Sequence, residues 1–183
     1  AGSQIDVPTV YDDIFNALSP LYDAFPKLDL LDIGGGFAVP NAPLAEMAAR
    51  IREFVKAHHL KLIVEPGRYL VAEAGTLLTE VLHVKEGARK HVICNAGMAD
   101  LLRPALYGAT HPIHLLAEDA STRPQVVADV DGPLCENADR LGQAVSLPEP
   151  RAGDVLAVSI AGAYGMAMAS NYASHLRPAE VVI

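Results

Sequence analysis

Two motifs place glycines and charged residues directly after apolar runs that are typical of buried strands. The run Leu28–Ile33 ends at the glycines Gly34–Gly36. Further on, the run Lys61–Val64 ends at Glu65–Arg68. Glycine tolerates positive φ and lets backbone N–H groups approach a ligand closely, although a glycine triplet alone more often forms a tight turn. Because the loops after the last two strands of β/α barrels often bind phosphate, two such strand ends favour a phosphate site.

A thiol and two carboxylates follow another apolar run. Cys135, Glu136 and Asp139 lie in one turn after the run Val126–Val130. A free cysteine is by default a small buried apolar residue. On an exposed loop, the same cysteine would be a proton donor, with the carboxylates holding a cationic group of a substrate. Both interpretations of Cys135 stay open, whereas Cys94 is expected in the core.

Arg103 and Tyr107 place a guanidinium and a phenol four residues apart, which suits a clamp for a carboxylate. A surface salt bridge beside a buried ring explains the pair equally well. Tyr164 lies between the small residues Ala163 and Gly165. It is either a core tyrosine or a residue that contacts a ligand.

Composition narrows the classes of partner. The 183 residues carry a formal net charge of −8, which argues against nucleic acid and anionic membranes as main partners. Apolar residues make up 51% of the chain, enough for a sizeable core. The two cysteines form no framework pattern and no signal-like N-terminus is seen, so we expect a reducing, cytoplasmic location.

Neither a membrane span nor a metal site is expected. Residues 155–174 carry no charged side chain, but polar side chains and glycines interrupt the run. The pattern favours a buried strand followed by a helical turn over a transmembrane helix. His111 and His114 are nearest to a ligand spacing, but Pro112 separates them and no carboxylate or cysteine completes a metal-binding set.

Periodicity predicts an α/β part first. Apolar residues recur at helical spacing from Asp12 onwards, where Pro20 is expected to break the helix, and again along residues 44–55. With the two strands already described, the order is helix–strand–helix–strand, as in a parallel sheet or barrel. Two strands cannot close a barrel, so this part is expected to be incomplete.

A mostly β part follows. Strands are predicted at Thr76–Val84, His91–Cys94, Val126–Val130 and Val155–Ile160. We place a domain boundary near Val84, so that residues 1–84 form the barrel part and residues 85–183 form the β domain.

With these residues in view, the chain resembles the fold-type III pyridoxal-phosphate-dependent decarboxylases, and within them the diaminopimelate decarboxylase family. Six motifs match in the family's order along nearly the whole chain. They are Gly2–Ile5, Gly34–Phe37, Glu65–Arg68, Ala96–Tyr107, Gly132–Glu136 and Ala161–Glu180. The resemblance implies an α/β plus β fold, in which the last βα units of a TIM-like (β/α)8 barrel precede a C-terminal β domain like that of alanine racemase and ornithine decarboxylase.

The resemblance also implies roles for single residues. Binding of the cofactor, pyridoxal 5'-phosphate, is implied for Ser3, Gly34, Gly35, Gly36, Glu65, Gly67, Arg68 and Tyr164. Binding of the amino-acid substrate is implied for Arg68, Arg103, Tyr107, Glu136 and Tyr164. Cys135 would be the catalytic proton donor. Family members work as homodimers with shared active sites, in which the loop with Cys135 and Glu136 reaches into the partner's site.

The implied reaction converts meso-diaminopimelate to L-lysine and CO2. Arg103 with Tyr107, and Glu136 after the cysteine, favour a substrate with a distal amino-acid head over ornithine. The family's Schiff-base lysine lies upstream of the matched region, so we expect these 183 residues alone to be inactive. Two alternatives stay open: a decarboxylase of another basic amino acid, such as ornithine, lysine or a modified derivative, and a non-catalytic fragment or homologue that acts by dimerisation.

Overall fold

The computed structural model describes residues 2–183, which form two compact units that divide between Val71 and Ala72. This division falls earlier in the chain than the boundary expected near Val84. The reason is that the strand Leu77–Lys85 pairs within the sheet of the second unit. Where the domains of the whole protein divide stays a prediction.

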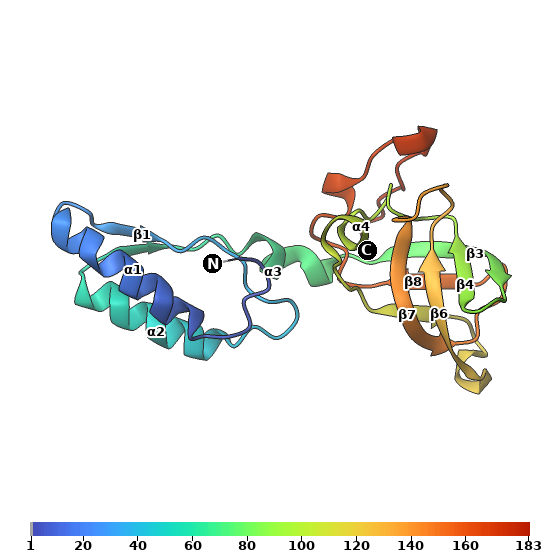
Figure 1. Ribbon diagram of the computed structural model, residues 1–183, viewed down its shortest axis with the longest axis horizontal. Coiled ribbons are helices and arrows are strands. Elements are labelled where there is room, and N and C mark those ends of the chain that lie inside the picture. The colour runs from blue at the N-terminus through green and yellow to red at the C-terminus, as the bar shows by residue number, and fades with distance from the viewer. Residues whose placement is uncertain (1) are drawn as a thin grey trace. The chain divides into compact units, whose positions relative to one another are not determined.

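The first unit combines two short parallel strands with two longer helices (Figure 1). Its elements are α1 (Val10–Ala24), β1 (Leu30–Asp32), α2 (Leu44–Ala57), β2 (Lys61–Ile63) and α3 (Gly67–Val71). The pairing of β1 with β2 runs from Leu30↔Lys61 to Asp32↔Ile63. The predicted order helix–strand–helix–strand is confirmed.

Both long helices turn one apolar face towards the strands. Tyr11 and Phe15 of α1 are buried in one cluster with Met47 and Ile51 of α2 and with Leu31 of β1. Residues four apart lie on the same face of a helix, so each pair forms part of a continuous apolar stripe.

The helix break expected at Pro20 is wrong, because α1 continues through this residue to Ala24. Proline removes one backbone hydrogen bond inside a helix. Leu18 and Tyr22, on either side of Pro20, both pack against the buried cluster of the first unit. Tertiary packing therefore holds the helix together across the proline.

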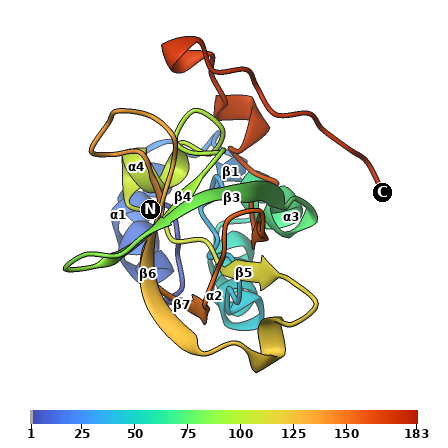
Figure 2. The same ribbon diagram turned by 90° about the vertical axis from the view of Figure 1, so that its right-hand side faces the viewer.

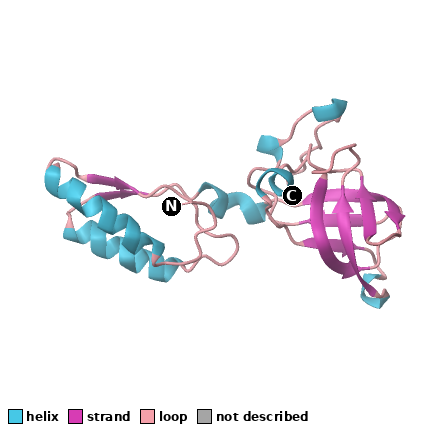
Figure 3. Cartoon of the chain, in the orientation of Figure 1, coloured by secondary structure: helices cyan, strands magenta, loops and turns pink. Residues whose placement is uncertain are grey.

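A six-stranded mixed sheet is the central element of the second unit (Figure 3). Its strands are β3 (Leu77–Lys85), β4 (Lys90–Cys94), β5 (Ile113–Leu116), β6 (Gln125–Asp131), β7 (Arg140–Pro148) and β8 (Val155–Val158). The helical turns are α4 (Arg103–Tyr107) and the 3-10 turns η1 (Ala72–Ala74), η2 (Ala120–Thr122), η3 (Met166–Met168) and η4 (Tyr172–Ser174). The strand order is β5-β8-β3-β4-β6-β7, with only the β4–β6 pair parallel.

The two ends of this strand order curl towards each other. A Cβ placed on Gly142 of β7 would stand 2.8 Å from Cδ1 of Ile113 in β5. The sheet is therefore nearly closed, and inward-facing side chains fill its interior. Val81, Val130 and Leu156 in this interior have no exposed surface. The four predicted strands correspond to β3, β4, β6 and β8, while β5 and β7 were not predicted from the sequence.

The segment after η4 extends away from the sheet of its own unit (Figure 2). Its apolar side chains are exposed, with 81% of Leu176 and 82% of Val181 accessible to solvent. Among residues 2–183, no helix has the length and apolar character needed to cross a bilayer.

We expect Leu156→Ala to lower the free energy of unfolding by about 2–5 kcal/mol, because it leaves a cavity in a close-packed interior. Leu156 is fully buried in β8 between β3 and β5. Leu116→Ala in β5 removes the same atoms from a side chain that is 53% exposed, and should cost less than about 1 kcal/mol. Chemical denaturation measures both, and equal losses would contradict the core described here.

Candidate active site

Three segments that are far apart in the sequence lie side by side at the carboxyl ends of β1 and β2. The backbone N–H groups of Gln4 and Ile5 both donate to the carbonyl oxygen of Gly36, at 2.9 and 2.8 Å. The N–H of Glu65 donates to the carbonyl oxygen of Gly34 at 2.7 Å. These bonds join the three segments into one surface, at the place where the sequence predicted a phosphate site.

We call the surface formed by residues 2–5, 34–38 and 65–68 the glycine cradle. Glycine is required at two positions of it. A Cβ on Gly35 would overlap the carbonyl oxygen of Glu65, and a Cβ on Gly36 would overlap that of Gly2. Gly36 also has a φ of 85°, which L side chains rarely adopt. The two glycines therefore let the three segments pack backbone against backbone, and such glycine-rich backbone is typical of phosphate-binding loops.

Arg68 joins the segments of the glycine cradle. Its Nη1 donates to Oε1 of Gln4 at 2.7 Å, and its Nη2 donates to the carbonyl oxygen of Phe37 at 3.3 Å. Both acceptors are neutral, so these contacts orient the guanidinium without cancelling its charge. The structure thus brings together the predicted residues of the first unit, namely Ser3, Gly34, Gly35, Gly36, Glu65, Gly67 and Arg68. A positive group beside glycine-rich backbone fits the phosphate of the implied cofactor.

In the second unit, a buried carboxylate anchors the loop that carries Cys135 and Glu136. Asp139, which is 3% exposed, accepts the N–H of Met98 on Oδ1 and the N–H of Leu134 on Oδ2, each at 2.6 Å. We call the loop from Gly132 to Asp139 the thiol loop.

Two glycines make room for the Asp139 carboxylate. A Cβ on Gly97 or on Gly132 would overlap its oxygen atoms. The backbone also closes the thiol loop, because the N–H of Gly132 donates to the carbonyl oxygen of Asp139 at 2.8 Å. The thiol loop is therefore fixed at its base while its tip faces solvent.

The two cysteines lie in opposite settings. Cys135 is exposed on the thiol loop. Cys94 in β4 has no exposed surface, and burial raises the pKa of its thiol to about 12. A cysteine acts as a nucleophile or exchanges protons near neutral pH only when its pKa and exposure allow it. Of the two thiols, only that of Cys135 is accessible to solvent.

Arg103 and Tyr107 are the first and last residues of α4. The N–H of Gly108 donates to the carbonyl oxygen of Pro104 at 3.0 Å, which closes this single turn. Because residues four apart in a helix share a face, the guanidinium and the phenol lie on one side of α4. Tyr107 is 64% exposed, so the alternative with a buried ring does not hold.

Tyr164 is held out of the core by a strained loop after β8. Ile160 and Tyr164 have φ values of 60° and 58°, which are uncommon for residues other than glycine. Their neighbour Ala163 is 5% exposed, whereas Tyr164 is 50% exposed. The structure therefore excludes the core-tyrosine interpretation. Strained backbone of this kind is often found at ligand sites.

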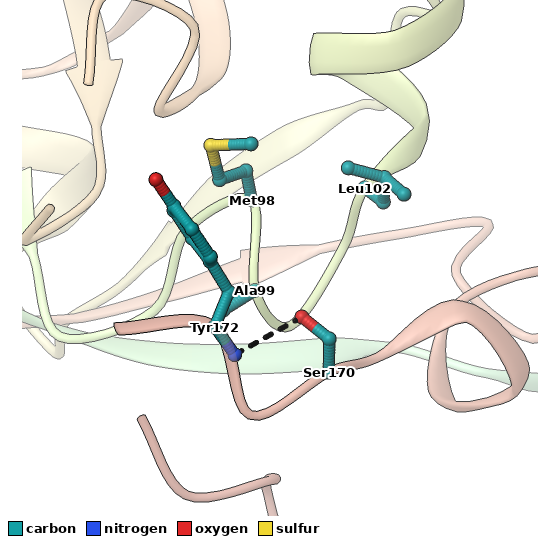
Figure 4. Close-up of a pocket in the computed structure, with 5 residues that line it drawn as sticks. All are labelled: Met98, Ala99, Leu102, Ser170 and Tyr172. Atoms are coloured by element: carbon teal, nitrogen blue, oxygen red, sulfur yellow. Dashed lines mark hydrogen bonds between the residues drawn. The ribbon is translucent and has the colours of Figure 1, made fainter. Parts of the chain in front are cut away.

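Tyr172 was not predicted from the sequence, yet it contacts the thiol loop. Its hydroxyl donates to a carboxylate oxygen of Glu136, and this hydrogen bond to a negative group raises the pKa of the phenol. Figure 4 shows Tyr172 beside Met98 in a pocket of about 250 Å³. The pocket is also lined by Ala99, Leu102 and Ser170. No local pattern marks Tyr172, because its partner lies 36 residues away.

One segment, residues 96–102, contacts each of these loops of the second unit. Its bond to Asp139 holds the thiol loop, as described above. The N–H of Ser170 donates to the carbonyl oxygen of Ala99 at 2.9 Å, which attaches the segment with Tyr172. Leu101 belongs to the buried cluster against which Ala161, in the loop of Tyr164, packs. Arg103 directly follows this segment in the chain.

Comparisons with known proteins identify the family of the chain. The family described as "Pyridoxal-dependent decarboxylase, C-terminal sheet domain" matches residues 9–162. The diaminopimelate decarboxylase of Deinococcus radiodurans is 41% identical over 181 residues, which cover 99% of this chain and 47% of that protein.

Two solved structures show the same fold over nearly the whole chain. Diaminopimelate decarboxylase from Helicobacter pylori, complexed with L-lysine, has a TM-score of 0.81 and 34% identity, covering 96% of this chain and 46% of that one. SrLDC, in complex with PLP and cadaverine, has a TM-score of 0.82 and 27% identity, covering 97% and 49%. The chain therefore spans about half the length of the relatives it matches. The predicted fold class, the last βα units of a barrel followed by a β domain, is confirmed.

We expect Asp139→Asn to lower the free energy of unfolding by about 1–3 kcal/mol, because an amide NH2 would replace one of the two acceptor oxygens and leave a buried N–H without its acceptor. Asn137→Ala, in the exposed part of the same loop, should change stability by less than about 0.5 kcal/mol. Urea unfolding measures both. If Asp139→Asn is as stable as the parent chain, the carboxylate does not anchor the thiol loop.

Proposed function

The chain belongs to the family of pyridoxal-dependent decarboxylases, and we propose that it is the C-terminal portion of an enzyme that converts meso-diaminopimelate to L-lysine and CO2. The observation that carries this proposal is the thiol loop, which presents Cys135 and Glu136 to solvent from a base fixed by Asp139. The diaminopimelate decarboxylase that is 41% identical over 99% of the chain supports the choice of substrate.

The glycine cradle is proposed to hold the phosphate of pyridoxal 5'-phosphate. Ser3, the glycines Gly34–Gly36 and the segment Glu65–Arg68 would bind it, and Tyr164 would lie beside the cofactor. When bound, the cofactor supplies an electron sink for the electron pair that departing CO2 leaves behind. The lysine that attaches the cofactor is proposed to lie in the upstream half of the protein.

The protein's own tasks are to orient the substrate and to deliver one proton. Arg68, Arg103 and Tyr107 would bind the carboxylate at the far end of the substrate through charge-assisted hydrogen bonds. Glu136 would accept a hydrogen bond from the amino group at that end. The thiol of Cys135 would then donate its proton to the carbon that has lost its carboxylate, with Tyr164 contacting the substrate near that atom.

The proposed working form is a cytoplasmic homodimer with shared active sites and no nucleic-acid or membrane partner. Both cysteines are free thiols, which suits a reducing compartment. The net charge of −8 disfavours binding to nucleic acid. The exposed tip of the thiol loop suits a role in the partner subunit's site.

A second candidate is decarboxylation of another basic amino acid. The similarity to SrLDC, which was solved with cadaverine, favours it. Cadaverine is a diamine without a carboxylate. A substrate that loses CO2 to give such a diamine carries no second carboxylate at its far end. The proposed clamp of Arg103 and Tyr107 would then have no carboxylate to bind. We therefore retain diaminopimelate as the first choice.

In the whole protein, Cys135→Ala should lower kcat by about 10²–10⁴-fold while the absorbance of bound pyridoxal phosphate stays unchanged, because only the proton donor is lost. Steady-state kinetics and an absorbance spectrum measure the two effects. Cys94→Ala is the matched control, since it removes a buried thiol and should leave kcat within about twofold. A Cys135→Ala enzyme with the parent's kcat would refute the proton-donor role.

Shared active sites predict complementation between two inactive variants. A Cys135→Ala subunit mixed with a subunit that lacks the cofactor-attaching lysine should recover about a quarter of the parent's activity, because half of the randomly paired dimers would hold one intact site. The activity of the mixture measures this recovery. A mixture without activity, although mass spectrometry shows heterodimers, would mean that each subunit builds its own site.

A further inference from the structure

A buried histidine contacts the arginine of the proposed carboxylate clamp. His111 lies in the link between α4 and β5 and is 7% exposed. Its Nε2 is 3.0 Å from Nη1 of Arg103, and its Nδ1 is 3.0 Å from the carbonyl oxygen of Ser159. The imidazole thus bridges the helical turn that carries Arg103 and the strand end after β8.

The chemistry of the two partners fixes the state of the imidazole ring. A guanidinium can only donate hydrogen bonds and a carbonyl oxygen can only accept them. Nδ1 therefore carries the proton that is donated to Ser159, and the lone pair of Nε2 accepts from Arg103. In this arrangement His111 is neutral, and its contact orients the guanidinium without cancelling the positive charge.

The anchor of His111 is a rigid part of the sheet. The N–H of Ser159 donates to the carbonyl oxygen of Pro112 at 2.8 Å, directly beside the paired residues Ile113↔Val158. Ser159 is thereby fixed by the β5–β8 ladder, and its carbonyl oxygen fixes His111. The position of Arg103 is in this way tied to the sheet and not only to the single turn of α4.

We propose that His111 is a positioning residue that holds the guanidinium of Arg103 ready to bind the carboxylate at the far end of the substrate. This inference rests on the proposed function, which assigns Arg103 to that carboxylate. A preorganised arginine loses less conformational freedom when the substrate binds, so His111 should act on substrate affinity. It should leave the proton-transfer step unchanged.

The chain offers matched variants for the test. His111→Phe removes both ring nitrogens from the contact. His111→Gln keeps one acceptor and one donor, since Oε1 can accept from Arg103 and Nε2 can donate to Ser159. His114→Phe makes the same change on an exposed residue of β5 and controls for the loss of a histidine. Arg103→Ala removes the clamp itself.

The experiment measures KM and kcat for meso-diaminopimelate in the whole enzyme with its cofactor, and the inhibition constants of L-lysine and cadaverine. We expect His111→Phe to raise KM and the inhibition constant of L-lysine about tenfold, with kcat within about twofold of the parent. The inhibition constant of cadaverine should stay unchanged, because cadaverine has no carboxylate. His111→Gln should restore most of the affinity, and His114→Phe should behave like the parent.

Two results would overturn the inference. One is an unchanged KM in His111→Phe, and the other is an equal loss of affinity for L-lysine and cadaverine, which would indicate general damage to the site.

The Arg103→Ala variant distinguishes a failure of the positioning role from a failure of the proposed function. If Arg103→Ala raises KM about 10–100-fold while His111→Phe does not, only the positioning role fails. If Arg103→Ala leaves KM unchanged, the proposed clamp itself fails. Should His111→Phe not fold, His111→Gln against His111→Asn gives the same comparison of KM with kcat.

Discussion

The carboxylate of Asp139 is buried between two loops and bonded to a backbone N–H of each. A carboxylate in such a place costs several kcal/mol unless hydrogen bonds replace its lost hydration, as a rough measure. Two short bonds to backbone N–H groups supply that replacement, and they also tie the thiol loop to segment 96–102. The same segment is bonded to the loop of Tyr172 through the N–H of Ser170, so it links the thiol loop to that second loop.

We propose that the two units bind anions in different ways. The glycine cradle would use backbone atoms, and its segments can pack this closely because Gly35 and Gly36 carry no Cβ to overlap the carbonyl oxygens of Glu65 and Gly2. The second unit uses a side chain, Arg103, whose single helical turn gives it little support of its own. Arg68 in the cradle and Arg103 in α4 share one feature, a neutral hydrogen-bond acceptor on the guanidinium. Such acceptors orient an arginine without themselves cancelling its charge.

The sequence predicted those parts of the fold that have a clear local period. Helices α1 and α2 have apolar stripes, and β3, β4, β6 and β8 are rich in β-branched and aliphatic residues. Strand β5 has four residues and includes the polar His114, so it lacks the unbroken apolar run that marks the equally short β8. Strand β7 includes Gly142 and the positive φ of Ala144, and its pairing with β6 shifts register twice, so its pattern of burial does not alternate.

Two segments of the glycine cradle, 34–38 and 65–68, were foreseen because they directly follow predicted strands, whereas the role of residues 2–5 came from the resemblance alone. The contacts that position the other site residues were not, since they join residues that are distant in the sequence. His111 is bonded to a partner eight residues before it and to another 48 residues after it. A resemblance to a family assigns roles to residues, but it does not show which neighbours hold them. Those neighbours emerge only from tertiary structure.

The most direct test of this account is the substrate specificity of the whole protein with its cofactor bound. The release of CO2 should be measured side by side from meso-diaminopimelate, L-lysine and L-ornithine. We predict CO2 and L-lysine from meso-diaminopimelate, with little turnover of the two substrates that lack a carboxylate at the far end. Equal or faster turnover of L-lysine or L-ornithine, or no turnover of any of the three by enzyme with bound cofactor, would contradict it.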